Sequence, residues 1–211
     1  MMKDWHMLPA EIEAQSMKII EEELGEISLP PLHKEIIKRV IHTSADFEYA
    51  RTLRFSPQAV QAGLEALQQQ AVIVTDTNMG LMGINADGLR RLGCTKQCFM
   101  AAPEVKAQAT ANGTTRAVAA MDKAAALQGP LIFAIGNAPT ALLRIQELIR
   151  QKKCRPALII GVPVGFVNVI DAKEGLMKMP VPYIVAKGRK GGSAIAAAIC
   201  NALLYMAIRK K

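Results

Sequence analysis

Short apolar runs that end on glycine or on polar residues recur through the second half of the chain. Residues 131–135 (LIFAI) lead into Gly136, residues 157–161 (ALIIG) lead into another turn, and residues 183–186 (YIVA) lead into residues 187–193 (KGRKGGS). Runs of this length and composition predict buried strands. The polar residues that follow then lie at the carboxyl ends of the strands, where open α/β sheets form their ligand crevice. This pattern predicts an enzyme that acts on a small molecule.

The full pattern predicts about five strands that alternate with helices. The strands are expected at residues 71–75, 97–101, 131–135, 158–161 and 184–186. Apolar residues at helical spacing, with start and stop signals such as Ser56-Pro57 and Asn112-Gly113, predict helices at residues 9–24, 32–42, 57–69, 85–92, 103–111, 115–127, 139–151 and 192–209. This alternation indicates an α/β fold, a mainly parallel sheet of about five strands with helices on both faces. The sequence contains no internal repeat or linker, so residues 1–211 are expected to form a single domain.

Composition narrows the choice of partner. Of the 211 residues, 51% are hydrophobic but only 4% are aromatic, so aliphatic side chains, alanine and methionine must fill the core. The 26 lysines and arginines outnumber the 18 acidic residues, which gives a net charge of +8. This charge favours an anionic partner, such as nucleic acid, acidic lipid, a phosphate or a polycarboxylate, or it describes only a solvated surface. Because the basic residues are not interleaved with aromatic ones, nucleic-acid binding is not expected.

The cysteines and the apolar segments indicate which cellular compartment to expect. The sequence has four cysteines, Cys94, Cys98, Cys154 and Cys200. They form neither a C-x-x-C pair nor a cluster with histidine, which favours free thiols in a reducing cytosol over a zinc site or disulfides. The N-terminus has no apolar signal core, and the apolar stretch 194–208 is shorter than the roughly 20 residues that span a bilayer. We therefore expect a cytoplasmic protein without membrane contact, with residues 194–208 in a buried helix. The methionine-rich segment 79–82 is expected in the core or, as the second choice, at a dimer interface.

Three histidines are present, and one stands out as a candidate for proton transfer. His6 lies near the N-terminus and His33 follows a Pro-Pro break, whereas His42 ends an apolar helix and precedes several polar residues. A lone histidine beside an apolar face is more often a structural residue. However, Arg39 lies three residues earlier on the same side of the helix, and an imidazole at position 42 could titrate near neutral pH and deliver a proton. Both roles stay open from the residues alone.

The turns around the predicted strands supply candidate substrate-binding residues. Asp76 and Thr77 end the first predicted strand, where they could orient a ligand or bind a metal, or could equally cap a helix or form a turn. Arg116 opens a helix whose free N–H groups, together with the guanidinium, could hold a carboxylate. Asn137 and Thr140 lie in a glycine turn before another helix, which also suits an anion.

Familiar nucleotide and hydrolase motifs are absent from the sequence. Residues 187–193 lack the lysine that a phosphate-binding P-loop requires before its serine, and neither G-x-G-x-x-G nor G-x-S-x-G occurs. The residues together predict an α/β protein for a large acidic ligand, without indicating which ligand.

Several segments taken together resemble the precorrin-8X methylmutase family of cobalamin biosynthesis. The similarity extends from Ala14 to Leu203. It rests on the joint occurrence, in this order, of residues 39–42 (RVIH), 136–142 (GNAPTAL), 161–166 (GVPVGF), 171–174 (DAKE) and 188–193 (GRKGGS).

This resemblance implies a three-layer α/β/α homodimer that moves a methyl group from C-11 to C-12 of a corrin precursor, by a 1,5-sigmatropic shift. The family's histidine falls on His42, which would protonate a ring nitrogen. The family's substrate-contacting serine and arginine fall on Ser16 and Arg39. No cofactor and no protein-bound metal are expected, because an isomerisation needs neither and any cobalt arrives within the substrate. The many carboxylates of that substrate agree with the positive net charge.

The family has two branches, and other functions have to be weighed beside it. One branch acts on metal-free precorrin-8X and the other on cobalt-precorrin-8. Residues 42–47, residues 75–77 and the lysine within residues 188–191, Lys190, are more similar to the cobalt branch. A non-catalytic carrier that holds a corrin could use the same basic crevice. A nucleic-acid protein is the third hypothesis, prompted by the net charge alone.

Overall fold

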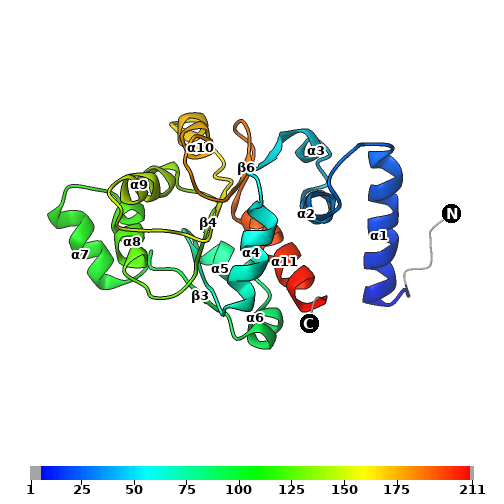
Figure 1. The fold of residues 1–211 in the computed structure, drawn as a ribbon, viewed down its shortest axis with the longest axis horizontal. Helices are drawn as coiled ribbons and strands as arrows, with labels where there is room; N and C mark the ends of the chain where they lie inside the picture. The colour runs from blue at the N-terminus through cyan, green and yellow to red at the C-terminus, as the bar shows by residue number, and fades with distance from the viewer. Residues whose placement is uncertain (1–5, 210–211) are drawn as a thin grey trace.

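The computed structural model describes residues 6–209 and is built around one six-stranded sheet (Figure 1). The strands are β1 (Leu53–Phe55), β2 (Val72–Thr75), β3 (Thr95–Gln97), β4 (Leu131–Ile135), β5 (Leu158–Gly161) and β6 (Tyr183–Ala186), in the order β1-β6-β5-β4-β2-β3. All neighbouring strands are parallel except β1, which is antiparallel to β6. The predicted α/β fold with a mainly parallel sheet is confirmed.

The sheet separates two apolar cores, because successive side chains of a strand point to opposite faces. Ile73 and Ile132 join one core, while their neighbours Val74 and Phe133 join the other. The helices that pack on the first core are α2 (Pro31–Ser44), α4 (Ala59–Gln68), α6 (Ala86–Leu92) and α11 (Ser193–Arg209). Those on the second are α7 (Pro103–Ala111), α8 (Arg116–Ala125), α9 (Pro139–Arg150) and α10 (Val169–Met177). Figure 1 shows these two helix layers on either side of the sheet.

Helix α1 (Pro9–Leu24) lies outside this three-layer body, against α2 (Figure 1). Ile20 and Leu24 are buried against α2, and Lys34 and Lys38 of α2 both bind Glu21. It also carries exposed apolar side chains, among them Ile12, which is 51% exposed. The first helix therefore packs chiefly on α2, whereas α11 is buried along most of its length.

One strand prediction was wrong, and one strand was missed. The run at residues 97–101 does not form a strand: β3 ends at Gln97, and Phe99 and Met100 pack instead against the core beneath α7 and α8. The sixth strand, β1, was missed because three residues are too few to show alternation. Its place depends on pairing with β6 more than 120 residues away, reinforced by Ser56, whose N–H donates to the Tyr183 carbonyl while its Oγ accepts from the Tyr183 N–H.

Three helices were also absent from the prediction: α3 (Tyr49–Thr52), α5 (Asn78–Gly83) and α10. The first two are single turns or little more, and α10 carries Gly175 in its interior, which weakens the helical signal.

The expectation that residues 79–82 lie in the core was wrong for the two methionines, since Met79 and Met82 are 72% and 76% exposed. Residues 194–208 do form the buried helix that was expected, within α11. Among the helices formed by residues 6–209, none combines the length and apolar content needed to cross a membrane.

Candidate active site

His42 lies in the last turn of α2, where α1 crosses it. Its Nδ1 is 2.8 Å from Oγ of Ser16, on α1, and no other hydrogen bond to the ring is formed within residues 6–209. The ring is exposed and lines a groove of about 350 Å³ whose walls are largely apolar, with Ile12, Ile19 and Phe47 among them. Because Ser16 occupies Nδ1, Nε2 is the nitrogen left to exchange a proton with a ligand in this groove.

Arg39 does not share the groove of His42, contrary to the expectation that the two lie on the same side of the helix. Its Nη2 donates to Oε1 of Glu13 at 2.7 Å, and its guanidinium lies 4.9 Å from the ring centroid of Tyr205. These side chains line a second groove, of about 370 Å³, between α1, α2 and α11. The two positions are about 60° apart around α2, and α1 lies between them, with Glu13 contacting one and Ser16 the other.

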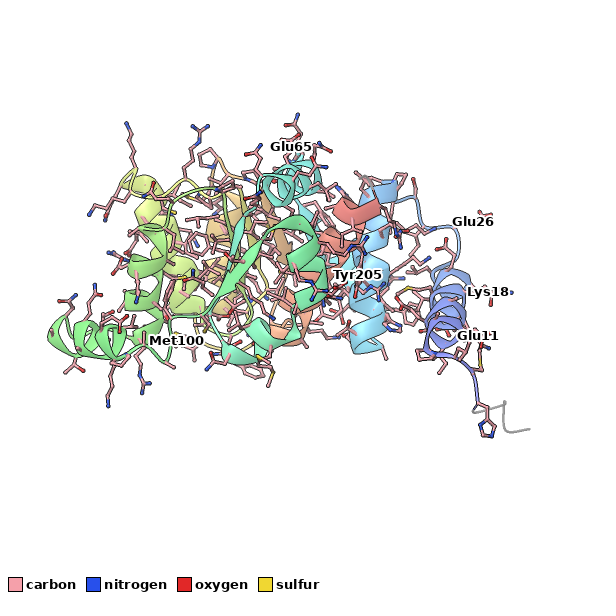
Figure 2. All side chains as sticks on the ribbon, turned by 90° about the horizontal axis from the view of Figure 1, so that it is seen from below. Glu11, Lys18, Glu26, Glu65, Met100 and Tyr205 are labelled. Atoms are coloured by element: carbon pink, nitrogen blue, oxygen red, sulfur yellow. The ribbon has the colours of Figure 1, made fainter. Side chains whose placement is uncertain are left out.

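Figure 2 shows how these side chains are arranged within the molecule. Glu11 and Lys18 mark α1 at one end, Met100 lies toward the other, and Tyr205 lies between them. The second groove, which Tyr205 lines, therefore lies where α1 meets the rest of the molecule.

Asp76 is buried and holds a turn, which is the structural role that the sequence left open beside contact with a ligand. Its carboxylate accepts the backbone N–H groups of Gly136, Asn137 and Ala138 at 2.9, 2.8 and 2.6 Å, and the residue is 1% exposed. Burial raises the pKa of this carboxyl, while the three N–H donors favour its charged form. The residue ties the end of β2 to the turn after β4, which is a positioning role.

The remaining candidates gather around the carboxyl ends of β2 and β4. Thr77 caps α5 by accepting the Gly80 N–H, and its Oγ1 lies 2.7 Å from Oγ of Ser193. Thr140 accepts from Thr115 at 3.4 Å, which brings the first turns of α8 and α9 together. The side chains of Asn137 and Arg116 are exposed at this edge, and Arg116 forms no ion pair with any described residue.

Neighbouring loops at this edge interlock backbone to backbone, which only glycine permits. A Cβ on Gly136 would lie 2.6 Å from Cα of Ser193, and one on Gly191 would lie 2.1 Å from the Val162 carbonyl oxygen. The Gly192 N–H donates to that same carbonyl at 2.9 Å. Backbone contacts therefore join the turns after β4, β5 and β6 into one continuous surface at this edge of the sheet.

Two lysines connect these turns to their surroundings: Lys173, which the sequence analysis did not single out, and Lys190, which it used only as a mark of the cobalt branch. Lys173 of α10 is 1% exposed, and its Nζ donates to the carbonyls of Gly188 and Lys190, both at 2.8 Å. Lys190 in turn donates to Oδ2 of Asp46 at 2.6 Å and to Oε2 of Glu48 at 2.7 Å. Both lysines fall in segments, 171–174 and 188–193, whose motif character was noted without a role for the lysines. Within residues 6–209, no group of three or more His, Cys, Asp and Glu side chains is placed to hold a metal ion.

Comparison with known proteins matches this chain to one protein family. The family model described as precorrin-8X methylmutase matches residues 11–206. The chain is 42% identical to cobalt-precorrin-8 methylmutase of Leptospira interrogans, covering 94% of both chains. It is 43% identical to cobalt-precorrin-8 methylmutase of Salmonella typhimurium, covering 93% of this chain and 95% of the relative. It is 38% identical to precorrin-8X methylmutase of Pseudomonas aeruginosa, covering 90% and 91%.

A solved structure agrees with these sequence matches. The crystal structure of precorrin-8x methyl mutase from Thermus thermophilus superposes with a TM-score of 0.88 at 45% identity, covering 95% of this chain and 97% of that one. The fold is therefore shared with that protein over nearly the whole chain.

Proposed function

Because the chain belongs to the precorrin-8X methylmutase family, an isomerase family of cobalamin biosynthesis, we propose how its own residues carry out the methyl transfer. The methyl group moves from C-11 to C-12 of the corrin precursor: the bond to C-11 breaks as the bond to C-12 forms. Electron pairs of the conjugated framework shift in step, so no oxidant or reductant is needed. The protein has to bind the macrocycle, orient it and move one proton.

His42 is the proton donor and acceptor in this proposal. The single observation that carries the role is the 2.8 Å contact between Ser16 Oγ and His42 Nδ1, which orients the ring and leaves Nε2 available in an apolar groove. A proton lent from Nε2 to the conjugated macrocycle withdraws electron density from the migrating framework, and it returns to the histidine when the product forms. A ring nitrogen receives this proton in the metal-free substrate, whereas in cobalt-precorrin-8 the ring nitrogens bind the cobalt and the proton has to go to the carbon framework. The apolar walls of the groove strengthen this interaction by excluding water.

Basic and polar side chains around the site bind the acetate and propionate carboxylates of the substrate. Arg116, Asn137, Thr77 and Thr140 lie at one edge of the sheet, where helix N-termini also present free N–H groups. Arg39 also binds the substrate in this proposal. A carboxylate of the substrate takes the place of the Glu13 carboxylate as the partner of the guanidinium.

We propose cobalt-precorrin-8 as the substrate, in agreement with the motifs at residues 42–47, 75–77 and 188–191. These motifs carry the proposal, because identity does not separate the branches: relatives named for the cobalt branch reach 42% and 43%, whereas those named for precorrin-8X reach 38% and 45%. We propose no cofactor, and the cobalt belongs to the substrate.

A second copy of the chain is proposed to complete the site. Pockets for drug-sized ligands occupy about 300–1,000 Å³, and a corrin precursor is larger than such a ligand, whereas the His42 groove offers about 350 Å³. Exposed apolar side chains are available to meet a partner copy, including Ile12 on α1 and Phe166, which is 86% exposed. Light scattering after size exclusion tests this homodimer directly.

Two further assignments belong to the proposal. The family model spans residues 11–206, and all six strands join one sheet, so we treat residues 1–211 as one methylmutase domain. Cys98, Cys154 and Cys200 form no disulfide within residues 6–209, which suits a reducing compartment, and we propose the cytoplasm.

An anaerobic absorbance time course with cobalt-precorrin-8, and with precorrin-8X in parallel, tests the function. Conversion to the cobyrinate spectrum, faster than conversion of the metal-free substrate, is expected. His42→Ala should bind the substrate without converting it, and unchanged turnover in that variant would rule out the proton-transfer role. A bound but unchanged spectrum with the wild-type protein would favour the carrier instead.

A further inference from the structure

The buried Lys173 and the loop that it holds are connected by direct contacts to the segment that follows His42. Lys173 comes from α10, on the face of the sheet opposite to α2. Its ammonium group donates to the carbonyls of Gly188 and Lys190, and the residue is 1% exposed. A lysine is seldom buried without a specific partner, because removing its charge from water is costly. Here both partners are carbonyls of one loop, residues 187–193.

The loop has little freedom where Lys173 holds it. Gly191 packs so closely on Val162 that no side chain fits, and the Gly192 N–H donates to the Val162 carbonyl. The Gly165 N–H donates to the Arg189 carbonyl at 3.2 Å. The backbone of residues 188–192 is therefore fixed from two sides, by α10 and by the turn after β5.

The side chain of Lys190 projects from this fixed backbone and binds the segment after α2. It contacts Asp46 and Glu48 at 2.6 and 2.7 Å. Asp46 lies between Ala45 and Phe47, and these two residues line the same groove as His42. The Asp46 N–H also donates to Ser44 Oγ, at the end of the helix that carries His42.

From these contacts we propose that Lys173 and Lys190 are positioning residues for the methyl transfer: together they set the wall of the His42 groove. Lys173 fixes the carbonyls of the loop, the loop fixes the point from which Lys190 extends, and Lys190 holds Asp46 and so places Ala45 and Phe47. Neither lysine has to touch the substrate. The inference rests on the proposed function of His42, because the groove matters only where the substrate binds.

The test compares Lys190→Met with Lys178→Met. Lys178 is exposed at the end of α10, so both changes remove one positive charge from the protein surface. Lys190→Met is expected to lower kcat on the order of tenfold, about 1.4 kcal/mol in barrier, with KM within about twofold of the wild type. Lys178→Met should turn over like the wild type. Unchanged kcat in Lys190→Met, or a rise in KM alone, would overturn the inference, the latter because it indicates direct substrate contact.

A double-mutant cycle and amide exchange test the steps that lead to Lys190. If Lys190 acts through Asp46, the effects of Lys190→Met and Asp46→Asn on kcat are not additive. Lys173→Met should speed amide hydrogen exchange both in residues 187–193 and in residues 43–49, and Lys178→Met in neither. Faster exchange confined to residues 187–193 would disprove the connection to the His42 groove. A failure of the proposed function is recognised separately, because the wild-type protein would then not convert the substrate at all. The exchange experiment needs no substrate, so its result stands in either case.

Discussion

Ser16 Oγ lies 2.8 Å from Nδ1 of His42, although the two residues are 26 positions apart and belong to different helices. Helix α1 therefore takes part in the site directly, by setting which nitrogen of the imidazole remains available. The same helix supplies Glu13, which binds Arg39 on the other side of the crossing. Attachment of α1 to α2 thus controls two of the three residues that the family resemblance singled out.

Ser16→Ala is expected to lower kcat up to about tenfold while KM stays nearly constant. The hydrogen bond to Nδ1 is worth about 0.5–1.5 kcal/mol, and its loss frees the ring to rotate. Turnover measured across pH with the cobalt substrate checks this expectation. Lys18→Ala, an exposed change on the same helix, is the matched control. Equal kcat for Ser16→Ala and wild type would show that the serine does not orient the histidine.

Removal of Glu13 and removal of Arg39 should change substrate affinity in opposite directions. Glu13→Gln frees the guanidinium from its internal partner, so KM should fall. Arg39→Met removes a charge-assisted contact worth about 1.5–3 kcal/mol, so KM should rise roughly 10- to 150-fold. Steady-state kinetics checks both variants, with Glu22→Gln on α1 as the control. A rise in KM for Glu13→Gln would contradict the carboxylate exchange at Arg39.

Asp76→Ala is expected to destabilise the protein, because it leaves three backbone N–H groups at the turn after β4 without acceptors. Each orphaned group costs about 1–3 kcal/mol, and a total near 3 kcal/mol is expected after water or relaxation recovers part of it. Urea denaturation measures the loss, and Asp76→Asn, which keeps one acceptor oxygen, should lose less. Unchanged urea midpoints in both variants would refute the positioning role.

Lys173 should make the free energy of unfolding depend on pH. Burial lowers the pKa of its ammonium from the ordinary 10.5 to about 8, and it forms no ion pair with a described residue. Between pH 8 and 10.5 the unfolded chain then binds more protons at this lysine than the folded protein does, so raising the pH stabilises the folded state. The wild type should gain on the order of 3 kcal/mol relative to Lys173→Met over that range.

Urea denaturation of both proteins at pH 7, 8, 9 and 10 measures this difference, and every other titrating group cancels in the comparison. Parallel pH curves for wild type and Lys173→Met would mean that the buried lysine keeps its ordinary pKa.

Local patterns were sufficient for most of the elements and for the family. Strands β2, β4, β5 and β6 are apolar runs bounded by turn residues, and the long helices show apolar spacing, both of which are properties of neighbouring residues. The motifs at residues 39–42 and 188–193 identified the family for the same reason. Where an element depends on a distant partner, as β1 depends on β6, local patterns carried too little information.

Which polar residues meet was decided only by the tertiary structure. Asp76 and Thr77 are adjacent in the sequence, yet one is buried by a turn 60 residues further on and the other lies beside Ser193. Arg39 and His42 share a helix but face different grooves, because α1 crosses between them. The sequence by itself determined the chemistry available at the carboxyl edge of the sheet. Its spatial arrangement followed from long-range packing, which has no periodic signature along the chain.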